Sequence, residues 1–163
     1  MRAVSNTSPI SNLASIGRLD LLKAQFQSLW IPTAVSQELS LHPDAAARAL
    51  IEVAIREQWI NVVALQDSPL LRTLMLHLHR GEAEAIALAT ELKADIAIID
   101  EQEGRQFAAQ TGLSVTGVLG ILLRAKKTGH ISMVKSEIDA LRVKGRFFVA
   151  PALEAKILAE AGE

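Results

Sequence analysis

Acidic residues gather in the middle of the chain, between Gly81 and Arg105. Residues 95–99 read Asp-Ile-Ala-Ile-Ile, a short run rich in β-branched residues, and Asp100 follows it directly. Such a run without polar alternation is typical of a strand that is buried on both faces of a parallel sheet. Ligands bind in the crevices outside the carboxyl ends of such strands. We therefore expect Asp100 at a ligand-binding edge.

Two further acids open the helix that should precede this strand. Glu82 and Glu84 fall in the first turn after Gly81. For Glu82 a structural interpretation is strong, because an acid in the first turn complements the helix dipole by about 0.3–1 kcal/mol. Glu84 opens a helix that ends just before the Asp100 strand, so it is a candidate for the same edge.

Glu38, on a helix that should begin after Pro32, is the third candidate. If Glu38, Glu84 and Asp100 meet, each pair about 4 Å apart repels by about 4 kcal/mol at an effective dielectric constant of 20. A hard divalent cation would relieve this repulsion and leave positions for phosphate oxygens. Such a site can activate water for phosphodiester cleavage. Three unrelated, solvated acids are the alternative interpretation.

The composition narrows the chemistry and the setting. The chain has no cysteine, which excludes disulfides, zinc ribbons and thiol catalysis and leaves oxygen or histidine ligands, as for Mg²⁺ or Mn²⁺. Its 163 residues predict a single domain over residues 1–163. The N-terminus lacks the apolar core of a signal peptide, and no run approaches the ~18 apolar residues of a membrane span. We expect a cytoplasmic protein without a membrane partner.

Charge is distributed unevenly along the chain. Residues 121–147 contain seven Lys or Arg and two acids, so this segment carries +5 within a chain of net charge −1. The remainder is therefore −6. A basic face on an acidic body is one pattern of nucleic-acid enzymes, and a solvated pair of helices gives the same pattern.

Short apolar runs alternate with amphipathic segments over most of the chain. This order predicts an α/β fold with right-handed crossovers and a parallel sheet covered by helices on both faces. The expected strands are Ala3–Asn6, Leu29–Ile31, Ile60–Ala64, Asp95–Ile99, Ser114–Thr116 and an edge strand at Phe147–Val149. The expected helices are Pro9–Ile16, Leu19–Gln25, one from Pro32, Ala45–Glu57, Leu70–Leu78, one from Gly81, Glu101–Thr111, Val118–Lys127, Met133–Arg142 and Pro151–Ala161.

Five motifs, taken together and in order, resemble the PIN-domain family, a group of small Mg²⁺- or Mn²⁺-dependent ribonucleases that includes many prokaryotic toxins of toxin–antitoxin pairs. The motifs are VSNTSPISNLASIGRLDLL, IPTAVSQEL, GEAEAIALA, IIDEQEGRQFA and VTGVLGILLRAKKTGHI. The resemblance is strongest to the branch of predicted PIN-like nucleic-acid-binding proteins. It implies a three-layer α/β/α PIN-like fold with a central parallel sheet.

The resemblance also assigns the catalytic and metal-binding residues. Glu38 matches the second acid of the family, Glu84 the third and Asp100 the fourth, while Asn6 stands where the family usually has its first aspartate. Asparagine keeps an oxygen ligand but removes one negative charge, so metal affinity should fall. We expect Asn6, Glu38, Glu84 and Asp100 to converge on one crevice at the carboxyl edge of the sheet.

Further residues are candidates for auxiliary roles or for contacts with nucleic acid. The auxiliary candidates are Ser8, Glu101, Glu103 and Thr116. The candidate phosphate contacts are Arg105, Arg124, Lys126 and Lys127, the last three expected near the rim of the crevice. Capping and turn formation are the alternative roles for Ser8 and Thr116. For Arg105 the alternative is an ion pair with Glu101, and for the lysines it is a solvated helix face.

Two functional hypotheses follow from the resemblance. The first is a metal-dependent endoribonuclease that acts on RNA as a toxin-like component, held in check by a cognate antitoxin and homodimeric as PIN proteins often are. The second is a catalytically degenerate PIN fold that binds RNA or a protein without cutting, because the first acid is Asn6. A nucleotide-binding domain is not supported, because no GxGxxG or P-loop motif follows any expected strand.

Overall fold

The computed structural model describes residues 1–144 and 147–163, and in this part the chain forms one parallel sheet of five strands in the order β3-β2-β1-β4-β5. The strands are β1 (Ala3–Ser5), β2 (Leu29–Pro32), β3 (Ile60–Val63), β4 (Ile96–Ile98) and β5 (Val115–Thr116). Every neighbouring pair is parallel. Five of the six expected strands are thus confirmed, and β1 lies at the centre.

The predicted edge strand at residues 147–149 is wrong, because these residues have no regular structure. A strand needs a partner with free backbone groups, and β5, the edge strand after the Asp100 segment, is only two residues long. Phe147 and Phe148 instead line a cavity beside Asp100.

Ten helices surround this sheet in the described residues. They are α1 (Thr7–Ser15), α2 (Asp20–Phe26), α3 (Thr33–Ser40), α4 (Ala45–Arg56), α5 (Pro69–Leu74), α6 (Arg80–Glu91), α7 (Gln102–Gln110), α8 (Val118–Lys127), α9 (Val134–Lys144) and α10 (Pro151–Ala161). Local signals set several of their starts. The Asp44 carboxylate accepts hydrogen bonds from the backbone N–H groups of Ala46 and Ala47, and Ser68 caps α5 in the same way.

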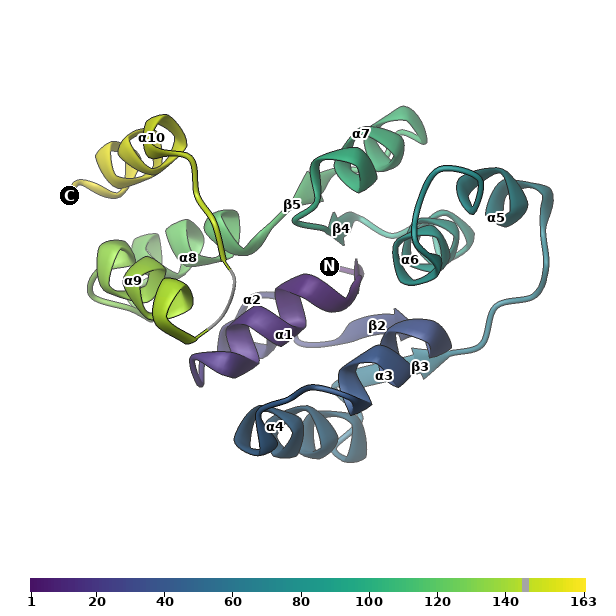
Figure 1. Cartoon of the computed structure of the whole chain (residues 1–163), viewed down its shortest axis with the longest axis horizontal. Helices are drawn as coiled ribbons and strands as arrows, with labels where there is room; N and C mark the ends of the chain where they lie inside the picture. The colour runs from purple at the N-terminus through teal and green to yellow at the C-terminus, as the bar shows by residue number, and fades with distance from the viewer. Residues whose placement is uncertain (145–146) are drawn as a thin grey trace.

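Two hydrophobic cores, one on each face of the sheet, give the three layers (Figure 1). Neighbouring strand residues alternate between them: Ala3 and Ile98 belong to the core with α1, α2 and α8, and Val4 and Ile99 belong to the core with α5 and α6. Alternate residues of a strand point to opposite faces. The structure therefore has the predicted three-layer α/β/α architecture.

The carboxyl ends of β1 and β4 lie side by side at one edge of the sheet. Ser5 pairs with Ile98, and the backbone N–H of Asn6 donates to the carbonyl oxygen of Ile98 at 3.3 Å. Asn6 and Asp100, which follow these strands, are thus brought to the same edge although 94 positions separate them in sequence.

The last helix, α10, is the least buried element of the fold. It packs against α8 and α9, and none of its residues is fully buried. Figure 1 shows it at the far end of the molecule from α3 and α5. Among the described residues, no helix is both long and apolar enough to cross a membrane.

Candidate functional site

Asn6 presents one free oxygen at the end of the central strand. The side chain is buried, and its Nδ2 donates to Oε2 of Glu101 at 2.7 Å. Because only the amide nitrogen can donate to a carboxylate, this bond fixes the orientation of the amide. Oδ1 is then buried without a hydrogen-bond partner among the described residues.

Asp100 offers a second free oxygen after the neighbouring strand. Its Oδ1 accepts a hydrogen bond from the backbone N–H of Val118 at 2.7 Å, which ties β4 to the start of α8. Its Oδ2 is buried and accepts no hydrogen bond in the part of the chain that the structure describes, although the Asn12 side chain lies close enough to lower the pKa of the carboxyl group. Gly117 makes this approach possible, since a Cβ at position 117 would lie 2.6 Å from Oδ1.

The electrostatics of this edge favour a proton or a cation. Burial raises the pKa of Asp100 to about 6, and the charge of Glu101 raises it further. The hydrogen bond from the Val118 N–H, the Asn12 side chain and the charge of Arg105 lower the pKa and offset part of this rise. Burial and the same Glu101 charge also raise the pKa of Glu82. Both carboxylates are thus less stable in their ionised form than in water.

Glu38 shares a cavity with Asn6. This cavity has a volume of about 440 Å³ and is lined by Asn6, Thr7, Glu38, His79, Arg80, Glu82 and Glu101. The Thr7 hydroxyl donates to Oε2 of Glu38. Close packing holds the carboxylate from the other side, because a Cβ at Gly81 would lie 2.7 Å from its Oε1. Of the four residues expected to converge, Asn6 and Glu38 therefore line the same cavity.

Glu84 has its own partners. It is buried, its Oε1 accepts from Nε of Arg80 at 2.8 Å, and its Oε2 accepts from the backbone N–H of Ala34 at 3.3 Å. These bonds tie the start of α6 to the start of α3, and Arg80 balances the charge. Glu84 is not among the residues that line the cavity of Asn6 and Glu38.

The four predicted residues therefore lie at one edge of the sheet without forming one cluster. Asp100 lines two neighbouring cavities instead of the one that holds Asn6 and Glu38. Within residues 1–144 and 147–163, no three Asp, Glu or His side chains are placed to hold a metal ion. The expected single crevice is therefore wrong: the residues lie at one edge of the sheet but in separate cavities. Arg80 pairs with Glu84, and the backbone N–H of Val118 at the start of α8 binds Asp100.

The oxygen atoms that remain still suit a hard divalent cation. Asn6 Oδ1 and Asp100 Oδ2 are buried acceptors without hydrogen bonds in the described chain, and Glu38 and Glu101 line the cavity of Asn6. Mg²⁺ is commonly held by one or two carboxylates together with water and substrate phosphates. These residues fit an ion that is held partly by water and phosphate oxygens better than an ion that is held entirely by protein ligands.

The auxiliary candidates take different positions. Glu101 contacts the site directly through Asn6, whereas Glu103 is exposed on α7. Thr116 lines a cavity with Asp100. Capping, the alternative role given for Ser8, does not occur, because α1 begins at Thr7 and Asn6 occupies the cap position.

Of the predicted phosphate contacts, Arg105 lies beside the site. Its Nη1 donates to the carbonyl oxygen of Ile99 at 2.9 Å, and the residue lines both cavities that contain Asp100. The alternative ion pair with Glu101 does not occur in the described part of the structure, where Glu101 accepts from Asn6.

Lys126 and Lys127 lie at the other end of α8 and contact the C-terminal segment. Lys126 is 3.3 Å from Glu163 and Lys127 is 3.1 Å from Glu160, and Arg124 is exposed on the same helix. A ten-residue helix is about 15 Å long. The helix therefore carries these residues away from the edge at which it begins, and neither lysine lines a cavity with Asp100.

Sequence reasoning missed two partners that shape the site. Arg80 pairs with Glu84, and their i, i+4 spacing was a signal that would have found this pair. Glu101 was only an auxiliary candidate, yet it orients Asn6 from 95 positions away. No local pattern predicts a contact at that separation.

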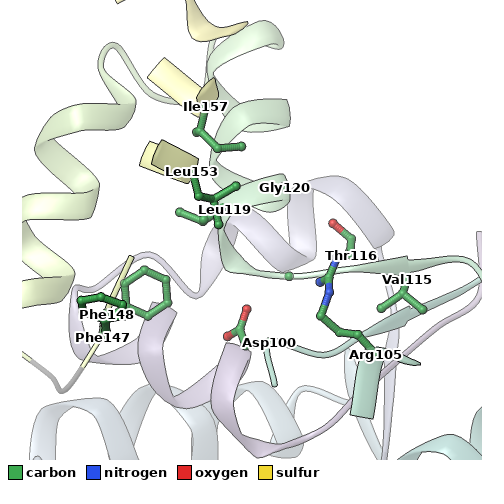
Figure 2. A pocket seen from close by; sticks show the side chains of 11 residues that line it. Asp100, Arg105, Val115, Thr116, Leu119, Gly120, Phe147, Phe148, Leu153 and Ile157 are labelled. Carbon is green, nitrogen blue, oxygen red and sulfur yellow. The ribbon is translucent and has the colours of Figure 1, made fainter. Parts of the chain in front are cut away.

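A second surface adjoins Asp100. Figure 2 shows its carboxylate between Phe147 and Phe148 on one side and Arg105 on the other, with Leu153 nearby. These residues line a cavity of about 390 Å³, and an adjoining one of about 700 Å³ extends along α7. The site thus opens onto a largely apolar groove.

Comparisons with known proteins agree with this architecture. A family model described as PIN domain matches residues 2–163. One similar solved structure is a PilT N-terminus domain protein from the hyperthermophilic archaeon Sulfolobus solfataricus P2, with a TM-score of 0.56 and 21% sequence identity over 77% of this chain and 93% of that chain. No curated protein matches the sequence. PIN domains have a nuclease-like fold and are generally dependent on divalent metals.

We predict that Asp100→Asn stabilises the metal-free protein in a pH-dependent way. The folded-state pKa of about 6 lies above the usual aspartate value of 3.8, so the wild-type protein loses stability as the pH rises from about 4 through 6. Asn cannot ionise and keeps an acceptor for the Val118 N–H. In urea unfolding with chelator, the variant should gain up to about 3 kcal/mol at pH 7.5 and much less at pH 4.5.

Glu103→Gln is the matched control, because it removes an exposed carboxylate from the neighbouring helix. Its free energy of unfolding should change by less than about 0.5 kcal/mol at either pH. A difference between Asp100→Asn and wild type that is the same at both pH values would contradict the assignment.

Proposed function

Because the chain belongs to the PIN-domain family, we propose that it is a Mg²⁺- or Mn²⁺-dependent endoribonuclease that acts at the acidic edge of its sheet. One observation carries this proposal. Asn6 Oδ1 and Asp100 Oδ2 follow two adjacent parallel strands, and both are buried without a partner among the described residues. Buried acceptors without partners are costly unless a ligand completes them.

Asn6 and Asp100 are the residues that would hold the ion, and Glu38 would join them only if the two cavities merged. Glu84 would join them if its ion pair with Arg80 opened. When bound, the ion would activate water and stabilise the charge that builds on the phosphate. Asn6 brings no negative charge, so occupancy of the site depends on phosphate oxygens from the RNA.

The cationic partner for the RNA backbone in this proposal is Arg105. Its guanidinium lies at the cavity of Asp100 and donates one hydrogen bond to the backbone of Ile99. The remaining donors suit a phosphate oxygen, because guanidinium and phosphate form strong charge-assisted bonds. Arg105 would thus hold the strand next to the cleaved bond.

We further propose a toxin-like role with a cognate antitoxin, as a homodimer in the cytoplasm. The support for this role is the resemblance of the five motifs to a family that includes many toxins of toxin–antitoxin pairs. Copurification of the protein with the product of a neighbouring reading frame, together with growth arrest when the protein is expressed alone, would test it.

The second candidate is a PIN fold that binds RNA without cutting it. Two observations favour it: the first acid is replaced by Asn6, and Arg80 already balances the charge of Glu84. Cation binding separates the candidates, because a module that only binds RNA has no need of Mn²⁺.

The proposed activity predicts cleavage of a mixed RNA panel with Mn²⁺ or Mg²⁺ and none with chelator. Asp100→Asn should reduce the rate by about 10²-fold or more, because it removes a charged group that acts on the transition state. Glu84→Gln should reduce the cleavage rate less than Asp100→Asn does, because the ion pair with Arg80 holds Glu84 away from the metal ion. Equal cleavage by wild type and Asp100→Asn would rule out this assignment.

Restoring the acid should strengthen the site. We expect Asn6→Asp to tighten Mn²⁺ binding in calorimetric titration and to raise the cleavage rate. The same change places a carboxylate where the amide now donates to Glu101 at 2.7 Å, so the metal-free protein should unfold more easily.

The control for this variant is Asn6→Asp combined with Glu101→Gln. It keeps the net charge of the natural sequence and restores a donor–acceptor pair in reversed order. The double variant should recover the stability of the metal-free protein. Unchanged Mn²⁺ affinity in Asn6→Asp would remove position 6 from the metal site.

Arg80→Gln should free Glu84 and tighten Mn²⁺ binding several-fold. The ion pair holds a carboxylate whose side chain is 7% exposed, so loss of Arg80 leaves a buried charge that a cation would stabilise. The control is Arg72→Gln, which removes the same charge from an arginine of α5 whose ion pair with Asp67 is exposed. The same affinity in both variants would show that Glu84 plays no part in metal binding.

A further inference from the structure

We propose that the groove beside Asp100 binds a nucleobase of a single-stranded RNA, stacked on the ring of Phe148. This inference rests on the proposed function, because it assumes that RNA is the ligand of the edge. It adds a subsite, built from Phe147, Phe148 and α10, that selects unpaired RNA strands.

The groove consists of two adjoining cavities. Asp100, Arg105, Val115 and Leu153 line both, so the space continues from the start of α10 past the acidic edge to α7. Its volumes of about 390 and 700 Å³ fall in the range of small-molecule sites. A base in this space would lie next to a phosphate at Asp100.

Phe148 is the most unusual residue of this surface. Its side chain is 83% exposed, and Leu153 on the next helix is 45% exposed. Both line the cavity, together with Phe147 (Figure 2). An apolar surface that gathers at the mouth of a cavity marks a binding site more often than scattered exposed residues do.

The polar residues of the groove identify a nucleotide as the occupant. Every base has a π face, and stacking on an aromatic ring contributes strongly to single-strand binding. Gln102 and Gln106 on α7 line the larger cavity, and each amide offers both donors and an acceptor for the edge of a base. Arg105, which lines both cavities together with Asp100, supplies the cation for the adjoining phosphate.

The geometry also selects the form of the RNA. A base that enters a groove between α7 and α10 must leave the stack of its own strand. Paired bases in an A-form helix do not offer their faces, whereas bases of loops and single strands do. The groove therefore favours unpaired RNA.

Binding measured in chelator separates this subsite from catalysis. The probes are fluorescein-labelled decamers of uridylate and adenylate, and an abasic ribose-phosphate decamer with the same number of phosphates. By fluorescence anisotropy, the wild-type protein should bind the base-containing decamers more tightly than the abasic one. Phe148→Ala should lose about tenfold or more on the base-containing decamers and remain unchanged on the abasic decamer.

Three variants control for other effects of the change. Phe148→Trp keeps an aromatic face and should retain base-dependent binding, whereas Phe148→Leu keeps an apolar side chain and should lose it. Leu41→Ala removes a side chain that is 81% exposed at the end of α3, far from α10 (Figure 1). This control should bind every decamer as the wild type does.

The proposal is overturned if Phe148→Ala binds base-containing decamers like the wild type, or if it weakens binding of the abasic decamer equally. It is also overturned if Phe148→Ala abolishes self-association in sedimentation while RNA binding is unchanged, because the groove would then be a protein interface. Base-dependent binding without cleavage in Mn²⁺ would refute the nuclease proposal alone. Cleavage without base-dependent binding would refute the subsite alone.

Discussion

Crowding of carboxylates at one edge of the sheet is the constraint on which the site depends. Parallel pairing of β1 with β4 brings Asn6 and Asp100 together, and α3 and α6 add Glu38 and Glu84. Burial raises the pKa of Asp100 and of Glu82 at this edge, and the charge of Glu101 raises both further. Each of these four side chains has a hydrogen-bond partner of its own.

The three acids at this edge have different kinds of partner, and they therefore lie in separate environments. Glu84 has a cation, Arg80, and a backbone N–H. Asp100 has the N–H of Val118, and Glu38 has the hydroxyl of Thr7. Within residues 1–144 and 147–163, Glu84 is the one acid of these three that forms an ion pair. The oxygens left over, on Asn6 and Asp100, are those that a ligand can complete, which explains why substrate phosphates would contribute much of the binding of a cation.

An asparagine in place of an aspartate at position 6 has a second effect besides the loss of one negative charge. Its amide donates to Glu101 at 2.7 Å, an arrangement that an aspartate at this position would replace with repulsion. The substitution therefore favours the stability of the empty site over the affinity for metal. In the proposed subsite, the apolar groove on the other side of Asp100 would bind the bases of the RNA strand. Base stacking does not depend on the metal ion.

The sequence by itself determined the alternation of strands and helices, the parallel three-layer fold and the positions of Asn6 and Asp100 after two strands. These features follow from periodicity and from the local rules for helix starts, which act over a few residues. The failures were of two kinds. The run at 147–149 has the residues of a strand, but strand formation needs a neighbour and β5 is too short to serve as one. The side-chain pairs of the site, such as Asn6 with Glu101, join residues 95 positions apart. Only the tertiary structure decided which acid is neutralised and which oxygen stays free, because those outcomes depend on distances and burial that no local pattern encodes.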